Sequence, residues 1–254
     1  MATGENTTKV LVTGFGVGAL LYVASPISVT NTCSAIFGHY QEPVLRDRLP
    51  PPTDPSLREP EVVPKLIADH DPDIMVHMGL AVERDYFAVE SSALKEGYHE
   101  IPDIARRVFT RAENKAQFGK SAASLSTDLP LDEVVDSWKD SVAQARLRLP
   151  TSFSTFPASG AGKARGSGKN GTKGNKEKEE QREVDVRLSD DVGTYVCGFM
   201  YYLSLLEMGK KGKRRNTVFF HVPRLGTEDV VDIGVKVTES LMQALVDAIT
   251  NKGT

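Results

Sequence analysis

The sequence predicts an α/β fold made of one domain. Apolar, β-branched segments typical of buried strands alternate with amphipathic segments typical of helices, and this order is that of a doubly wound sheet. The chain has 254 residues, of which 40% are hydrophobic, so it can bury one substantial core and does not require a second. We therefore expect one sheet with helices on its faces.

The first strand is predicted at Lys9 to Thr13, and Gly14-Phe15-Gly16 ends it. Residues 1–8 are expected to be a disordered N-terminus. The apolar run from Val10 to Ala24 is too short to span a bilayer, and its glycines argue against a signal peptide. A strand that runs into a glycine turn delivers the next residues to the carboxyl edge of the sheet, where α/β folds hold their sites.

Residues 17–55 show neither helical periodicity nor alternation and are an atypical part of the domain. Order returns with a helix at Glu59 to His70, whose apolar residues share one face. A buried strand then follows at Ile74 to Met78, and Gly79 ends it. Helix, short turn and strand make up one half of a doubly wound unit.

A short strand is predicted at Tyr86 to Glu90, with a carboxylate at its end. Taken alone, Glu90 is better explained as a solvated edge residue. Residues 91–125 are weakly patterned and are expected to be loops with one short helix at Asp103 to Arg107. The spacing of apolar residues from Leu131 to Leu149 predicts a longer amphipathic helix.

Residues 151–183 are rich in Ser, Gly, Lys and Glu and poor in apolar residues, which predicts a disordered insertion between two parts of one domain, 9–150 and 184–254. Whether its charges bind a partner is left open. After it we expect a strand at Val184 to Leu188, a helix starting near Cys197, a strand at Thr217 to Val222 and a helix at Val230 to Ile249.

The composition narrows the function classes. The formal charge of −3 gives no general attraction to nucleic acid or to an anionic membrane, so neither is an expected partner. The two cysteines and five histidines show no metal-ligand spacing, and two cysteines make no disulfide framework. We expect a cytosolic protein that uses no metal or cofactor, and the sequence does not predict its oligomeric state.

Cys197 is the first candidate for catalysis. It stands where the polar turn Ser189 to Thr194 becomes a helix, and the positive end of a helix dipole stabilises a thiolate. The alternative is a small apolar side chain on the buried face. His221 ends a neighbouring strand and is a candidate general base, and Glu90 is a candidate for the carboxylate that orients it.

These blocks resemble the pyroglutamyl peptidase I family of cysteine peptidases. The resemblance rests on Gly14-Phe15-Gly16, on Glu90, on the nine residues from Ser189 to Cys197 with Tyr201-Tyr202 behind them, and on Phe220-His221-Val222-Pro223. It implies an open, mixed and mostly parallel α/β/α sheet. It also implies that Cys197 is the nucleophile, His221 the base and acid, and Glu90 the third member of the triad. The implied reaction is removal of an N-terminal pyroglutamyl residue from a peptide through an acyl-enzyme, without metal or cofactor.

The resemblance also assigns substrate contacts to Phe15, Tyr195 and Val196, with Leu80 in a loop, Gly79 to Ala81, that offers backbone hydrogen bonds. After Gly16 the chain departs from the family pattern and lacks a second ring-clamping phenylalanine. One hypothesis is that residues 17 to about 40 come from a retained intervening segment. Two other functions stay open: a cysteine hydrolase with another acyl specificity, and a non-catalytic interaction protein that works through residues 151–183.

Overall fold

The computed structural model describes residues 8–15, 20–24, 59–101, 108–150, 181–210, 212 and 214–251. A six-stranded sheet forms its centre, with the strand order β2-β1-β3-β10-β4-β9. The strands of this sheet are β1 (Lys9–Phe15), β2 (Leu20–Ala24), β3 (Ile74–Leu80), β4 (Phe87–Glu90), β9 (Val186–Ser189) and β10 (Thr217–Val222). The helices are α2 (Glu59–His70), α3 (Arg111–Phe118), α4 (Leu131–Gln144), α5 (Val196–Lys210) and α6 (Glu228–Thr250).

The sheet is mixed. β3 pairs in parallel with both β1 and β10, and β4 pairs in parallel with β9. The antiparallel pairs are β1 with β2 and β10 with β4. The predicted fold class is therefore confirmed, as an α/β domain with a mixed, mostly parallel sheet.

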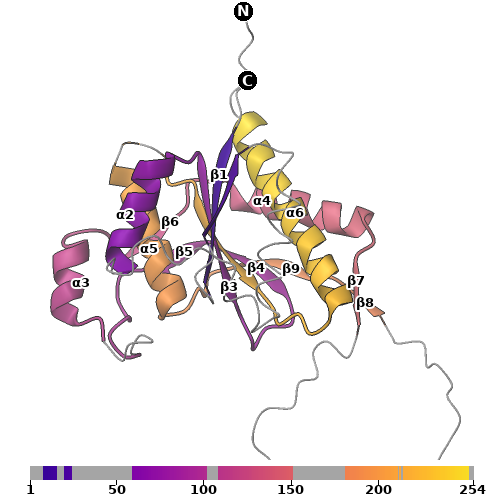
Figure 1. The fold of residues 1–254 in the computed structure, drawn as a ribbon, viewed down its shortest axis with the longest axis horizontal. Helices are drawn as coiled ribbons and strands as arrows, with labels where there is room; N and C mark the ends of the chain where they lie inside the picture. The colour runs from indigo at the N-terminus through magenta and orange to yellow at the C-terminus, as the bar shows by residue number, and fades with distance from the viewer. Residues whose placement is uncertain are drawn as a thin grey trace, which may run out of the picture.

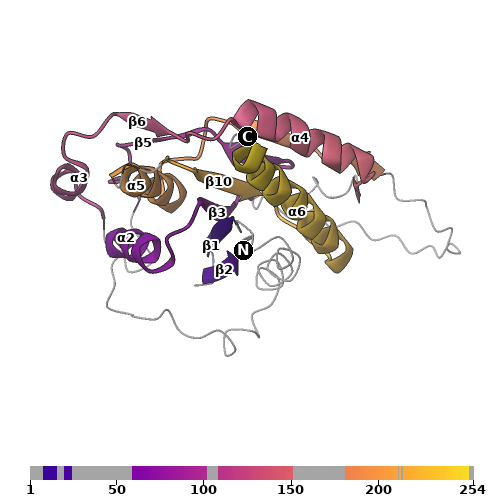
Figure 2. The same ribbon diagram turned by 90° about the horizontal axis from the view of Figure 1, so that it is seen from above.

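Helices cover both faces of the sheet. α2 and α5 lie on one face and α4 and α6 on the other, as both ribbon views show (Figures 1 and 2). Alternation along each strand divides the core in the same way. In β10, for example, Val218 and Phe220 pack toward α4 and α6, whereas Phe219 packs toward α2 and α5.

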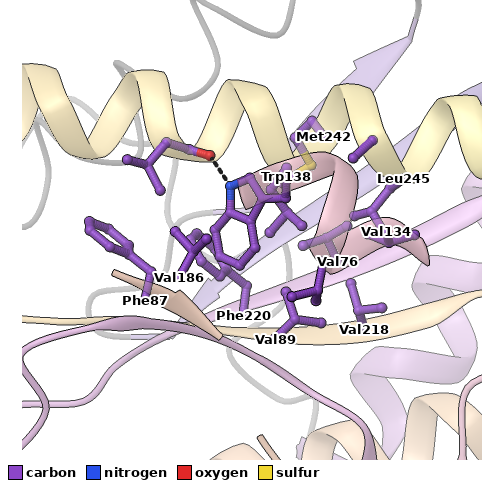
Figure 3. Packing of buried hydrophobic residues seen from close by; sticks show 14 of the residues in the cluster. Val76, Phe87, Val89, Val134, Trp138, Val186, Val218, Phe220, Met242 and Leu245 are labelled. Atoms are coloured by element: carbon purple, nitrogen blue, oxygen red, sulfur yellow. Dashed lines mark hydrogen bonds between the residues drawn. The ribbon is translucent and has the colours of Figure 1, made fainter. Parts of the chain in front are cut away.

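Trp138 of α4 anchors the larger half of the core. Its side chain is fully buried, and Figure 3 shows it among side chains of the sheet and of α6. Its indole Nε1 donates a hydrogen bond of 2.8 Å to the carbonyl of Val237, so burial leaves no unsatisfied donor (Figure 3). The bond also fixes α4 against α6.

The N-terminal part differs from the sequence-based prediction. β1 does not end at Thr13 but continues through Gly14 and Phe15, because both pair with β3. β2, inside the segment that has no sequence pattern, pairs antiparallel with β1. Backbone pairing thus decides structure where side-chain periodicity is silent. The predicted disorder of residues 1–7 and the rest of residues 17–55 lie outside the described residues.

The middle of the chain holds more structure than expected. Residues 91–125 contain a small antiparallel pair, β5 (Ser92–Leu94) with β6 (Ser124–Ser126), and the helix α3 between them. A capping box starts α3, since Thr110 accepts from the amide of Glu113 and the Glu113 carboxylate accepts from the amide of Thr110. The helix expected at Asp103 to Arg107 lies outside the described residues.

Two predicted segments around the insertion are wrong in extent. The helix from Leu131 ends at Gln144 instead of Leu149, because Arg146 has a positive φ of 50° and β7 (Arg148–Pro150) follows. The last three residues of the expected disordered insertion form β8 (Gln181–Glu183), which pairs antiparallel with β7. An ion pair of 3.1 Å between Arg148 and Glu183 joins these strands. Residues 151–180 lie outside the described residues.

The C-terminal third follows the prediction closely. β10 has the predicted bounds, α5 begins at Val196, and α6 runs two residues earlier and one residue later than predicted. The predicted strand before α5 is shifted and forms β9. None of the helices in the described ranges is both long and apolar enough to cross a lipid bilayer.

Candidate active site

The ends of β3, β4 and β10 bring the candidate residues to the sheet face that α5 covers. His221 pairs in register with Gly79 of β3 on one side and with Ala88 of β4 on the other. Phe219, two residues before His221, packs in the core under α5, so the imidazole of His221 faces α5 as well. Their rings lie 4.7 Å apart, centroid to centroid.

Glu90 and His221 form a buried pair. Nδ1 of His221 lies 2.7 Å from Oε1 of Glu90, and the two side chains are 7% and 0% exposed. A carboxylate only accepts, so Nδ1 carries the proton and Nε2 is the basic nitrogen when the ring is neutral. The bond thus sets the tautomer that a general base needs. The solvated-edge alternative for Glu90 is wrong.

Arg84 is a further member of this cluster. It lies in the turn after β3, where its amide donates to the carbonyl of Ala81. Its Nη1 donates to the same Oε1 of Glu90 at 2.6 Å, and its Nη2 donates to the carbonyl of Asp191 at 2.6 Å. One guanidinium therefore joins the carboxylate to the loop that leads into α5.

These contacts keep Glu90 ionised. Burial by itself raises the pKa of Glu90, but the hydrogen bond from His221, the nearby Ser189 hydroxyl and the bond from Arg84 together hold that pKa below its ordinary value. The contribution of Ser189 is one of proximity, because Oε2 of Glu90 has no partner with hydrogen-bond geometry among the described residues. His221 thus faces a carboxylate.

Cys197 is the second residue of α5, as the sequence predicts for the helix start. Its sulfur lies over Gly79, where a Cβ added to the glycine would come within 3.3 Å of Sγ. The same Cβ would meet the ring of Phe219 at 2.8 Å. Because Gly79 is the register partner of His221, the sulfur stands above the strand next to the imidazole.

The expected thiolate is not supported. Burial is the largest influence on Cys197 and, with the charge of Glu90, raises its pKa to about 11, against the lowering effects of its own amide and of Arg84. Desolvation therefore outweighs the favourable end of the helix, and the resting group is a thiol. Among the described residues, Sγ forms no hydrogen bond with His221. The structure thus joins Glu90 to His221 directly and places Cys197 beside them.

α5 is held to the sheet by polar groups spaced along the face that carries Cys197. Tyr201, one turn after Cys197, donates from its buried hydroxyl to the backbone carbonyl of Glu90 at 2.9 Å. Ser204, two turns after it, bonds Nε2 of His77 at 2.6 Å. The other ring nitrogen of His77 bonds the hydroxyl of Thr13 at 2.6 Å. These contacts fix the position of α5, and with it that of Cys197.

Glycines shape the entry to α5. Gly193 has a φ of 80°, a conformation that favours glycine. Its carbonyl lies so close to Gly198 that a Cβ added to Gly198 would be 2.1 Å from the oxygen. The same Cβ would be 3.2 Å from the ring of Tyr98. The residue after Cys197 is therefore a glycine for steric reasons.

Comparison with known proteins points to one family. The chain is 21% identical over 174 residues to a pyrrolidone-carboxylate peptidase from Pyrococcus furiosus, a match that covers 68% of this chain and 62% of that protein. The family model for pyroglutamyl peptidase matches residues 173–252, which include Cys197 and His221. The resemblance to the pyroglutamyl peptidase family is confirmed.

A solved structure supports the same fold. The structure of a mutant pyrrolidone carboxyl peptidase from the hyperthermophile Pyrococcus furiosus aligns with 75% of this chain and 76% of its own chain, at a TM-score of 0.50 and 15% identity. At that identity the likeness concerns the fold alone. The chain spans less than two thirds of the length of the curated relative that it matches.

The residues that the pyroglutamyl peptidase resemblance implies as substrate contacts differ in their exposure. Leu80 and Tyr195 are exposed, at 40% and 41%, and Val196 is half-buried at the start of α5. The backbone of Phe15 ends β1 opposite Gly79, but its side chain lies outside the described part. The amide of Ala81 donates to the carbonyl of Val222 and is therefore not available to a substrate, contrary to expectation.

Within the described residues, no group of three or more His, Cys, Asp or Glu side chains is arranged to hold a metal ion.

The sequence did not identify Arg84, Tyr201 or His77 as contacts of the site or of α5. A loop arginine carries no periodic signal, whereas the spacing of Tyr201 and Ser204 from Cys197 indicates a shared helix face.

Proposed function

We propose that this chain is a cysteine peptidase that hydrolyses an N-terminal pyroglutamyl residue from peptides. The observation that carries the proposal is the buried hydrogen bond between Glu90 and His221. The sulfur of Cys197 lies over Gly79 of the strand next to that of His221. A carboxylate that orients an imidazole beside a thiol is the arrangement of a nucleophilic triad. The similarity to the pyroglutamyl peptidase family supports the choice of substrate.

The proposed reaction starts from the thiol. Nε2 of His221 takes the proton as Sγ attacks the carbonyl carbon of the pyroglutamyl residue, and Glu90 stabilises the imidazolium that forms. Amides in the first turn of α5, where a helix has no internal acceptors for its N–H groups, stabilise the oxyanion. The C–N bond then breaks and His221 protonates the leaving amine. Water attacks the thioester, gives one proton to His221, and releases pyroglutamate as the proton returns to sulfur.

The acyl group is the small, neutral lactam. We infer that the exposed Leu80 and Tyr195, with Val196 beside the nucleophile, and Phe15 supply the apolar contacts for its ring. The peptide with its N-terminal pyroglutamate is thus the partner, and no nucleic acid or membrane is involved. We also infer that the protein works in the cytosol, because its thiol chemistry needs a reducing compartment.

The acyl specificity is tested with three fluorogenic amides of one amine, carrying pyroglutamyl, prolyl or glutaminyl groups. The proposal predicts release of the amine from the pyroglutamyl amide alone. Release from another amide instead identifies a cysteine hydrolase with a changed acyl specificity. A folded protein that releases amine from none of the three contradicts the proposal.

A non-catalytic role is tested by deletion of residues 151–180, with a flexible Gly/Ser linker of about six residues in their place. That segment connects β7 to β8, whose ends are already paired. The proposed function predicts that the deletion leaves hydrolysis of the pyroglutamyl amide within about twofold, because the cost of closing a loop varies slowly with its length. If the chain is instead a non-catalytic interaction protein, the deletion should impair its function and Cys197→Ala should not.

A further inference from the structure

Arg84 is a cation beside the site whose guanidinium donates to two acceptors. The turn after β3 brings its side chain inward, and only 15% of it is exposed. Its Nη1 and Nη2 contact two acceptors on different segments, the carboxylate of Glu90 and the carbonyl of Asp191, each at 2.6 Å. Asp191 is 107 residues away along the chain.

The two acceptors have different roles in the proposed reaction. Oxygen Oε1 of Glu90 is also the one that Nδ1 of His221 binds, so Arg84 limits the rotation of that carboxylate. Asp191 lies in the loop that continues through Tyr195 into Cys197. A planar guanidinium reaches both acceptors at a fixed separation, which a lysine ammonium on its flexible stem does not do.

The charge of Arg84 also acts on the sulfur. Besides burial, Glu90 raises the pKa of Cys197 and Arg84 lowers it. The side-chain charges that act on the sulfur are thus the carboxylate of Glu90 and its arginine partner. Removal of the arginine charge alone leaves the carboxylate uncompensated.

We propose that Arg84 is a positioning residue, which holds Glu90 in register with His221 and fixes the loop before Cys197 through the second arm of its guanidinium. The assignment rests on the proposed function for its catalytic consequence, but not for its effect on the sulfur. Arg84 acts through its neighbours and is not itself expected to touch the substrate.

The chain offers a matched control. Arg187 of β9 stacks on the ring of Tyr86 at 4.1 Å, a ring that Arg84 approaches at 5.6 Å. Arg187 pairs with Asp185 at the surface and contacts neither Glu90 nor the loop before α5. Arg187→Met therefore removes a nearby arginine without touching the cluster.

The experiment compares Arg84→Met, Arg84→Lys and Arg187→Met in the full chain with Cys33→Ala, so that Cys197 is the one remaining cysteine. The first readout is the rate of iodoacetamide alkylation between pH 7 and 9. Arg84→Met should alkylate more slowly, by about tenfold for each unit by which the pKa of Cys197 rises. Arg84→Lys keeps the charge and should alkylate at a rate close to that of the parent, as should Arg187→Met.

The second readout is kcat for the pyroglutamyl amide. Arg84→Lys should lower kcat by about tenfold or more, because the charge remains but the double contact is lost. Alkylation of Arg84→Met at the parent rate, or full kcat in Arg84→Lys, overturns the assignment. Should the parent protein fail to hydrolyse the amide, the proposed function fails, and the alkylation rates still decide the role of Arg84 at the sulfur.

Discussion

Oε1 of Glu90 accepts a hydrogen bond of 2.7 Å from Nδ1 of His221, and this contact runs diagonally across the antiparallel strands β4 and β10. The carboxylate also accepts a hydrogen bond from Nη1 of Arg84, and the backbone carbonyl of Glu90 accepts one from the hydroxyl of Tyr201. Glu90 is therefore the point at which the candidate base, a cation and α5 meet.

Glu90→Gln should separate catalysis from thiol reactivity. The amide cannot stabilise an imidazolium, so kcat/KM for the pyroglutamyl amide should fall by at least about 100-fold. The charge of Glu90 raises the pKa of Cys197, so its removal lowers that pKa, and alkylation at pH 8 should become faster. Glu83→Gln, an exposed change in the same loop, should alter neither rate; parallel losses of both rates in Glu90→Gln would contradict this account.

Tyr201→Phe should lower kcat more than Tyr202→Phe does. The change removes a buried hydrogen bond to Glu90 and should lower the free energy of unfolding by about 0.5–1.5 kcal/mol. Tyr202→Phe is the control, because the Tyr202 hydroxyl bonds the carbonyl of Ala122, away from the site. Chemical denaturation should show similar losses, whereas kcat should fall only in Tyr201→Phe. Equal kcat in both variants would show that Tyr201 does not position Glu90.

Gly198→Ala should displace the helix start. The added Cβ would lie 2.1 Å from the backbone oxygen of Gly193, and this backbone contact relaxes only if the loop or α5 moves. We expect a loss of about 1–3 kcal/mol in stability together with most of the activity. Gly209→Ala in the same helix meets only the flexible side chain of Arg215, at 3.0 Å, and should be tolerated. A fully active Gly198→Ala protein would show that the tight entry to α5 is not required.

His77 should make the stability depend on pH. Burial lowers its pKa from 6.5 to about 3, so the unfolded chain takes up a proton at a higher pH than the folded protein does. Below pH 6.5 the wild type should therefore lose stability relative to His77→Gln, by up to about 1.4 kcal/mol per pH unit until pH 3 is approached. Denaturant unfolding at a series of pH values measures the difference, and a difference independent of pH between 6.5 and 4 would contradict the prediction.

Patterned elements could be predicted from the sequence and unpatterned ones could not. The apolar face of Glu59–His70 and the β-branched run Thr217–Val222 gave the observed bounds, since packing against the sheet is what both patterns record. β2 is apolar throughout and β8 is polar throughout, so neither shows the alternation that predicts a strand; their pairing with β1 and β7 makes them strands. α3 has a polar sequence, and its capping box was the signal available for it.

The site could be predicted in part. Glu90 and His221 meet because Glu90 pairs with Phe219 across the antiparallel strands β4 and β10, and His221, two residues after Phe219, shares the same face. The sequence did not predict that β4 runs antiparallel to β10. The expected thiolate was wrong, since desolvation of Cys197 depends on how deeply α5 packs and the sequence does not state that depth. Arg84 was missed because its two contacts form only when the loop closes over the sheet.

The most direct test of the account compares the two cysteines of the chain. Release of amine from the pyroglutamyl amide is measured for wild type, Cys197→Ala and Cys33→Ala, with circular dichroism to show that each protein is folded. The account predicts that Cys197→Ala abolishes release, because no other group at the site supplies the sulfur nucleophile, while Cys33→Ala retains it. Continued release by folded Cys197→Ala would contradict the central claim.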